Sequence, residues 1–270
     1  MRRIVIVSLG LALVACGQNP EPAVPAVDAP VATDAGPASS REPLKDVIER
    51  TPQYLVGIAY PEVANAHPRL ADALRGYAAK ARADLDEAVK LAGEGGHLHG
   101  PYDLSLNFTE LLNRPEVVAI AAEGSLYTGG AHGIPLIARF NYLPQEDRLL
   151  APQDLIPDRE GWEAISAHVR SQLREQVLAR LAEDQLSDAE RAEVIRTTGG
   201  MIDEGTGPDA GNFAQFEPIP AADGRWFGLR FVFPPYQVGP YSDGTQAVDV
   251  PVGVFRAHLA PKYRAMFTGG

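Results

Sequence analysis

The sequence predicts an α+β protein in which mainly antiparallel strands carry packed helices. Segments that alternate apolar and polar residues, as strands with one wet face do, occur in both halves of the chain. Long segments with apolar residues at three- and four-residue steps, as in amphipathic helices, lie between them. The expected order is strand, helix, three strands, two helices, three strands and a final helix. This order is neither strict βαβ alternation nor pure β, which favours the α+β class.

The folded part is expected to start with a strand at residues 54–60, closed by Pro61. A long amphipathic helix should follow over residues 67–92, because its apolar residues recur at helical spacing. Its apolar stripe consists of Leu70, Leu74, Tyr77, Ala81 and Leu85, and Ala88 or Val89 continues it. The glycines from Gly93 to Gly96 are expected to end it.

Three strands are expected after this helix. Residues 101–110 show the clearest alternation of apolar and polar side chains in the chain. Two more strands are predicted at residues 117–127 and 135–142, joined by a connection that contains Gly129 and Gly130. Both glycines are expected to take positive φ angles, where a Cβ atom would clash.

The second half of the chain is expected to start with two helices. The first covers residues 161–184, and the second follows Ser187, whose spacing from Glu190 matches a capping box. The remaining elements are strands at residues 212–220, 224–233 and 245–252, then a closing helix or two up to residue 267, interrupted near Pro261.

The N-terminus resembles the export signal of a bacterial lipoprotein. Arg2 and Arg3 precede the apolar run 4–15, which is too short to span a bilayer. The run ends in the letters LVACG, which are similar to a lipobox with Cys16 as the lipid-bearing residue. The resemblance implies a signal peptide at residues 1–15 and several acyl chains on Cys16, hence a stable membrane anchor. Glycine rather than aspartate after this cysteine implies sorting to the outer membrane, with the chain facing the periplasm.

Residues 16–43 are expected to form an unstructured tether, because they are rich in proline, alanine and acidic residues and have no apolar periodicity. Cys16 is the only cysteine, so no intramolecular disulfide can form. The formal net charge of −11 argues against nucleic acid as a partner and would favour cationic ones.

Two motifs in the folded part carry a family resemblance. The first is the YTGGAH segment, and the second is a spaced pattern made of Phe233, Tyr236, Tyr241 and Gly244. Together they resemble the extracellular domain of RsiV-type anti-sigma factors, which also occurs beside the catalytic domain of PdaC-type peptidoglycan deacetylases. Residues 44–143 are similar to the PdaC-type segment and residues 144–270 to the RsiV-type segment, as parts of one compact unit.

The resemblance implies an envelope domain without catalytic activity, which in RsiV-type proteins binds lysozyme. Unlike these relatives, the chain shows neither a transmembrane segment with a sigma-binding part nor a deacetylase domain. The expected function is therefore an envelope lipoprotein that binds a protein partner, a lysozyme-like peptidoglycan hydrolase, as inhibitor, immunity factor or sensor. It is expected to be no enzyme and to need no cofactor. The alternatives are a cell-wall glycan hydrolase or deacylase and a structural envelope lipoprotein.

The candidate binding residues are aromatic side chains and one histidine, namely Tyr127, His132, Tyr236 and Tyr241. A loop of tyrosines stiffened by proline gives a large contact area at a low entropic cost. The alternative is that these rings fold back to cover the end of a sheet, with His132 orienting its own turn.

No catalytic or metal-binding residue is predicted. His132 as a metal ligand would need His97, His99 or Asp103, whose spacing is a weak signal. As a catalytic base it would need a nucleophile, and the nearby serines, such as Ser125, lie outside any nucleophile motif.

Overall fold

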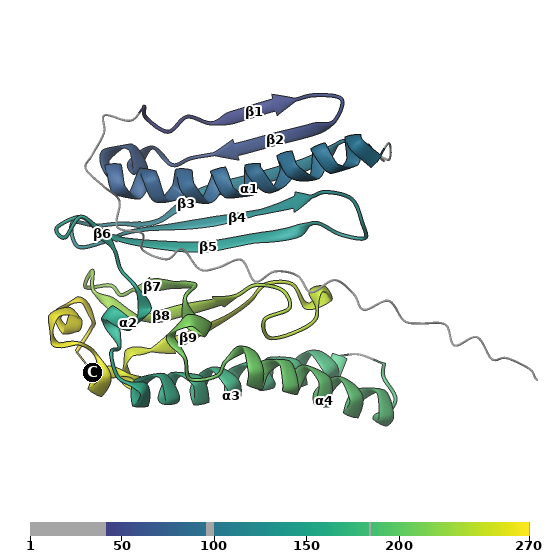
Figure 1. Ribbon diagram of the computed structural model, residues 1–270. Coiled ribbons are helices and arrows are strands. Elements are labelled where there is room, and N and C mark those ends of the chain that lie inside the picture. Colours follow the sequence, from purple (N-terminus) through teal and green to yellow (C-terminus); the bar gives the residue numbers. More distant parts are fainter. Residues whose placement is uncertain (1–41, 96–99, 184, 270) are drawn as a thin grey trace, which may run out of the picture.

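Two β-sheets lie side by side in the computed structural model, which describes residues 42–95, 100–183 and 185–269 (Figure 1). The predicted signal, the lipobox cysteine Cys16, most of the predicted tether, and His97 and His99 lie outside these residues. The first sheet has the order β1-β2-β3-β4-β5-β6, with β1 Val47–Arg50, β2 Tyr54–Ala59, β3 Tyr102–Asn113, β4 Val118–Tyr127, β5 Ile134–Leu143 and β6 Arg148–Leu149. The second has the order β7-β8-β9, with β7 Phe216–Pro220, β8 Trp226–Phe233 and β9 Gln246–Pro251.

The helices and the strand pairing together confirm the α+β class and its mainly antiparallel sheets. The helices are α1 Pro68–Gly95, α2 Pro152–Leu155, α3 Arg159–Glu183 and α4 Asp188–Gly205. The 3₁₀ turns are η1 Glu62–Ala66, η2 Ala210–Phe213, η3 Tyr241–Asp243, η4 Val252–Val254, η5 Arg256–His258 and η6 Pro261–Met266. Strands β2 and β3, which α1 connects, pair in parallel, and the other named strands pair antiparallel. None of the helices in the described ranges is long and apolar enough to cross a bilayer.

Three short elements escaped the sequence prediction. Strands β1 and β6 and helix α2 are only two to four residues long, so they show no periodicity that could identify them. The expected closing helix consists instead of three separate 3₁₀ turns, because prolines and Gly253 interrupt residues 251–267. The predicted capping box at the start of α4 is confirmed, since Ser187 and Glu190 exchange both hydrogen bonds.

The six-stranded sheet and α1 form the first lobe. Helix α1 packs on one face of this sheet, and four of the five residues in its predicted stripe are buried. The alternation in β3 points Leu104, Leu106 and Phe108 toward this core. Tyr77, the fifth residue of the stripe, packs edge-on against Phe108 and Phe140. The other face of β3 is therefore its polar one.

The three-stranded sheet, α2, α3, α4 and the C-terminal turns form the second lobe. Its core is rich in aromatic side chains, which contact one another in a continuous cluster of Trp162, Phe213, Phe216, Phe231 and Phe233. Large rings compensate for the small number of strands, since each ring buries more apolar area than an aliphatic side chain.

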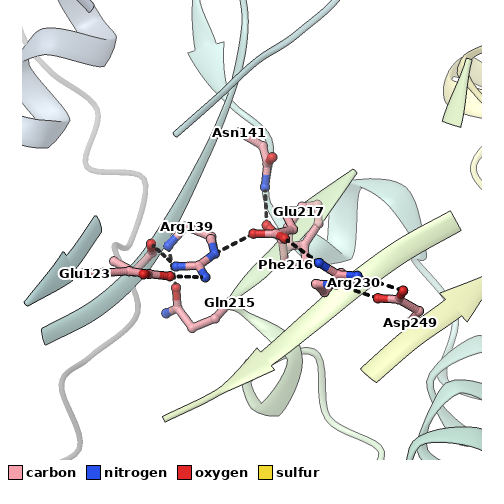
Figure 2. A network of polar contacts seen from close by, with 9 residues as sticks. Glu123, Arg139, Asn141, Gln215, Phe216, Glu217, Arg230 and Asp249 are labelled. Carbon is pink, nitrogen blue, oxygen red and sulfur yellow. Dashed lines mark hydrogen bonds and ion pairs between the residues drawn. The ribbon is translucent and has the colours of Figure 1, made fainter. Parts of the chain in front are cut away.

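The two lobes meet along β5 and β7, which lie next to each other without forming a strand pair. Side chains make the connection instead. The backbone N–H of Arg139 donates to the side-chain oxygen of Gln215 at 2.7 Å, and the amide of Asn141 donates to the carbonyl of Phe216 at 2.7 Å (Figure 2). This contact is called the β5–β7 joint below.

Candidate functional site

The hairpin between β4 and β5 carries the first half of the candidate site. Gly129 and Gly130 take φ angles of +94° and +101°, which confirms the expected positive φ at both positions. The hydroxyl of Tyr127 donates to the carbonyl of Gly130 at 3.2 Å and so closes the turn. This turn presents His132 as an exposed side chain.

The second half of the site is the loop between β8 and β9, which begins with two prolines. Tyr236 in this loop has a φ angle of +73°, a conformation that costs a non-glycine residue about 1–3 kcal/mol. Its backbone N–H donates to the carbonyl of Gly239 at 3.0 Å. The side-chain amide of Gln237 donates to the carbonyls of Gly205 at 2.9 Å and Asn212 at 2.8 Å. The hydrogen bonds of Gln237, the residue after Tyr236, therefore hold Tyr236 in its strained conformation.

Tyr241 is fixed by a different set of contacts. It opens the 3₁₀ turn η3, in which Asp243 accepts a hydrogen bond from Arg180 of α3 at 2.7 Å. The carboxylate of Asp243 is only 14% exposed, so this ion pair is partly shielded from water. The position of the Tyr241 ring is thus set by α3.

The two halves meet at His132. Its ring stacks on the ring of Tyr241, with centroids 3.8 Å apart and an interplanar angle of 14°. The Tyr236 hydroxyl lies 3.1 Å from His132 Nε2, and the Tyr241 hydroxyl donates to the Gly133 carbonyl at 3.2 Å. The Tyr236 and Tyr241 rings lie 5.7 Å apart. His132, Tyr236 and Tyr241 are called the aromatic cluster below.

The hydrogen bonds indicate the tautomer of His132. Nδ1 lies 3.3 Å from the carbonyl of Gly133, which can only accept, so Nδ1 carries the proton. In the neutral ring Nε2 then accepts from the Tyr236 hydroxyl. Both ring nitrogens of His132 thereby have a hydrogen-bond partner within the protein.

The residues considered for chemistry do not gather around His132. Ser105 and Ser125 face each other across β3 and β4, and neither hydrogen-bonds to His132 in the described ranges. His97 and His99, the potential metal partners, lie outside the described residues. Among the residues that are described, no group of three or more histidine, cysteine or acidic side chains could hold a metal ion.

The structure brings three of the four sequence-predicted binding residues into contact, and it places Tyr127 as a support for the hairpin. Sequence reasoning missed Gln237, which anchors the tyrosine loop, and Arg139, the charged centre of the β5–β7 joint. One signal could have identified Arg139, because it stands alone as a charge in the apolar strand 134–143.

Comparison with known proteins finds a family model that matches part of the chain. Residues 153–253 match the model of a family described as a protein of unknown function, DUF3298. This stretch is similar to DUF3298. The DUF3298 segment contains Tyr236 and Tyr241, whereas His132 lies before it. The aromatic cluster therefore joins the DUF3298 segment to the preceding lobe.

Two solved structures are similar to the chain. A DUF3298 family protein from Pseudomonas aeruginosa PAO1 is 18% identical with a TM-score of 0.53, covering 84% of this chain and 96% of that one. A member of the DUF3298 family from Bacteroides fragilis NCTC 9343 is 16% identical with a TM-score of 0.49, covering 81% of this chain and 94% of that one. No curated protein sequence matches the chain. At 18% identity, the similarity to the Pseudomonas protein shows the fold alone.

Proposed function

We propose that the protein is an envelope lipoprotein whose two lobes bind a protein partner without catalysing a reaction, and that this partner is a lysozyme-like peptidoglycan hydrolase. The observation that carries the proposal is the aromatic cluster. Three rings from two lobes meet at the surface, and one of them is held at a strained backbone angle. Strain of this kind persists where the surrounding structure over-determines it, commonly at binding sites.

The chemistry of the cluster supports recognition rather than catalysis. Tyrosine and histidine rings provide rigid, amphipathic contact area, as interface anchors do. Both nitrogens of His132 already have protein partners, and neither serine of β3 and β4 reaches it. The resemblance to RsiV-type domains supports a hydrolase of the lysozyme type as the partner.

The proposal is tested by calorimetric titration of the full-length chain, in detergent micelles, with a purified lysozyme-type hydrolase. Binding at micromolar concentration or tighter is expected, together with inhibition of the hydrolase on peptidoglycan. Tyr241→Ala should weaken binding at least tenfold. Phe227→Ala is the matched control, because Phe227 is an aromatic residue, 50% exposed, at the opposite end of β8 from the tyrosine loop.

Three results would count against the proposal. Wild-type chain that binds no such hydrolase contradicts the partner assignment. Equal affinities of Tyr241→Ala and wild type contradict the site. Turnover of peptidoglycan by the chain itself, lost in His132→Ala, would favour the alternative of a glycan-modifying enzyme.

The lipid anchor is a separate part of the proposal and rests on the sequence around Cys16. Metabolic labelling with a palmitate analogue should label the wild-type chain and not the Cys16→Ser variant. Membrane fractionation should find the labelled chain in the outer membrane. Unlabelled wild-type chain in a soluble fraction would overturn this assignment.

A further inference from the structure

The aromatic cluster depends on how the two lobes are placed relative to each other. His132 belongs to the first lobe, and the tyrosines that contact it belong to the second, 104 residues later for Tyr236. The contacts are tight, with 3.1 Å between the Tyr236 hydroxyl and His132 Nε2 and 3.8 Å between stacked ring centroids. A hydrogen bond of this kind tolerates only a few tenths of an ångström of displacement.

Strand β5 links the aromatic cluster to the β5–β7 joint, so a small change of angle at the joint becomes a larger displacement at His132. Arg139 lies five residues after Ile134, the first residue of β5, or about 17 Å at the rise of a β-strand, and His132 precedes Ile134 by two residues, so the two side chains are on the order of 20 Å apart. A tilt of about 5° at the joint would then move His132 by about 2 Å. The geometry of the joint must therefore be fixed to within a few degrees.

Arg139 has the contacts needed to fix it. Its Nε donates to Glu217 of β7 at 2.7 Å, and its Nη2 donates to Glu123 of β4 at 2.7 Å. Its Nη1 donates to the carbonyl of Ala138 at 3.1 Å. The guanidinium is planar and offers donors in a rigid fork, so these acceptors define its plane. The side chain is 6% exposed and that of Glu217 is 15% exposed, which limits competition from water.

The charges continue beyond Arg139 in a row that crosses both lobes. Glu217 lies 3.8 Å from Arg230 of β8, and Arg230 pairs with Asp249 of β9 at 2.6 Å. Figure 2 shows the row running from Glu123 through Arg139 and Glu217 to Asp249, with acids and bases alternating. It connects the hairpin strands β4 and β5, which flank His132, with β8 and β9, which flank the tyrosine loop.

We propose that Arg139, with Glu217, is a positioning residue for the binding site: it sets the angle between the lobes and so brings His132 against Tyr236 and Tyr241. This inference rests on the proposed function as far as partner binding is concerned. A buried ion pair is a poor source of stability compared with apolar packing, so we assign this one a different role: the directional hydrogen bonds of Arg139 define the angle between the lobes. An apolar pair at the same place would hold the lobes together without fixing their angle.

The test replaces the ion pair by apolar residues in the double variant Arg139→Met/Glu217→Leu. NMR spectra of the full-length chain report on the cluster, because the stacked Tyr241 ring shifts the ring-proton signals of His132. These signals are assigned by their loss in His132→Gln. The double variant should melt within a few degrees of wild type, lose the ring-current shift of His132 and bind the hydrolase at least tenfold more weakly.

Glu217→Gln is the second variant, because it removes the charge and keeps an acceptor for Arg139. It should retain the fold and part of the ring-current shift. Arg225→Gln is the matched control, since Arg225 is 49% exposed in its ion pair with Asp223 and lies outside the row. It should leave the His132 signals unchanged.

A folded double variant with an unchanged His132 shift would overturn the inference. If the double variant does not fold, unchanged His132 signals in Glu217→Gln overturn it, and a changed shift with an intact melting curve supports it. The NMR measurement needs no partner, so a wild-type chain that fails to bind the hydrolase would overturn the proposed function alone.

Discussion

The β5–β7 joint and the aromatic cluster both connect the two lobes, but they use opposite physical means. At the joint, Arg139 is almost fully buried among carboxylates and amides. At the cluster, an exposed histidine stacks on a half-buried tyrosine and shares one hydrogen bond with another. In our proposal the two connections have different roles. The buried charges of the joint fix the angle between the lobes, whereas the accessible rings of the cluster contact the partner.

The joint and the cluster should also differ in how much each contributes to the free energy of unfolding. Removing one partner of a buried ion pair leaves an uncompensated charge and costs about 3–5 kcal/mol. An aromatic contact contributes about 0.5–1.5 kcal/mol beyond its buried area. Single substitutions that leave one charge of the joint unpaired should therefore act mainly on unfolding, whereas variants at the cluster should act mainly on binding of the proposed partner.

The largest effect is expected for Arg139→Ala. It should lower the free energy of unfolding by about 3–5 kcal/mol, because Glu217 loses its closest cation in a site with little water. Urea denaturation followed by circular dichroism measures this change. Arg230→Ala, whose salt-bridge partner Asp249 is 47% exposed, should cost less than about 1 kcal/mol. Equal effects of the two variants would show that burial does not distinguish them.

The anchoring of the tyrosine loop is tested by Gly205→Ala at the end of α4. A Cβ atom at this position would lie 1.9 Å from the carbonyl oxygen of Gln237, so the loop has to move. The variant should lose about 1–3 kcal/mol of stability, as overpacked sites do, and should bind the partner more weakly. Gly199→Ala is the matched control in the same helix, because its Cβ would meet nothing within 4 Å.

The control is expected to change stability in the opposite direction. Alanine is favoured over glycine in a helix interior, so Gly199→Ala should raise the free energy of unfolding by about 0.5–1 kcal/mol. Thermal melting curves of both variants measure the difference in sign. A stabilised Gly205→Ala variant would mean that the contact with Gln237 does not constrain the tyrosine loop.

At the cluster itself, His132→Ala should change stability by no more than about 1.5 kcal/mol, because the stacked pair with Tyr241 and the two hydrogen bonds of the ring all lie at an exposed side chain. Its effect on partner affinity should be tenfold or more. Titration and denaturation of the same preparation compare the two effects. A large loss of stability with normal affinity would assign the cluster to folding, like the joint.

The smallest effect is expected at the far end of β5, where Glu146 contacts Lys262 and Arg148. The hydrogen bond from Lys262 lowers the pKa of Glu146, although partial burial opposes this shift. A carboxyl whose pKa is lowered on folding adds stability above its unfolded pKa and loses it as the pH falls through the folded pKa. Glu146→Gln should therefore cost under about 1 kcal/mol at pH 7 and nothing well below the folded pKa.

Urea denaturation at pH 7 and at the lowest pH below the ordinary pKa of a glutamate at which the chain still folds measures this difference between wild type and Glu146→Gln, which should shrink toward the lower pH. A cost that stays the same at both pH values would show that the ionised carboxylate is not what stabilises this end of β5.

Much of the architecture was already predictable from local sequence patterns. The alternation in β3 and the helical stripe of α1 identified their elements because each pattern repeats over many residues. The positive φ angles of Gly129 and Gly130 and the capping box at Ser187 follow from backbone sterics and local hydrogen bonds. Short elements such as β1 and β6 contain too few residues for such a pattern.

The sequence by itself thus determined the class of fold, most of its helices and strands, and the residue types from which a binding surface could be made. Only the tertiary structure decided that His132, Tyr236 and Tyr241 touch and that Tyr127 does not join them. It also decided that Arg139 is buried in the β5–β7 joint rather than exposed to solvent. The contacts that His132 and Arg139 make with the second lobe join residues 76 to 109 positions apart, so they depend on how two lobes pack and leave no local periodicity in the chain.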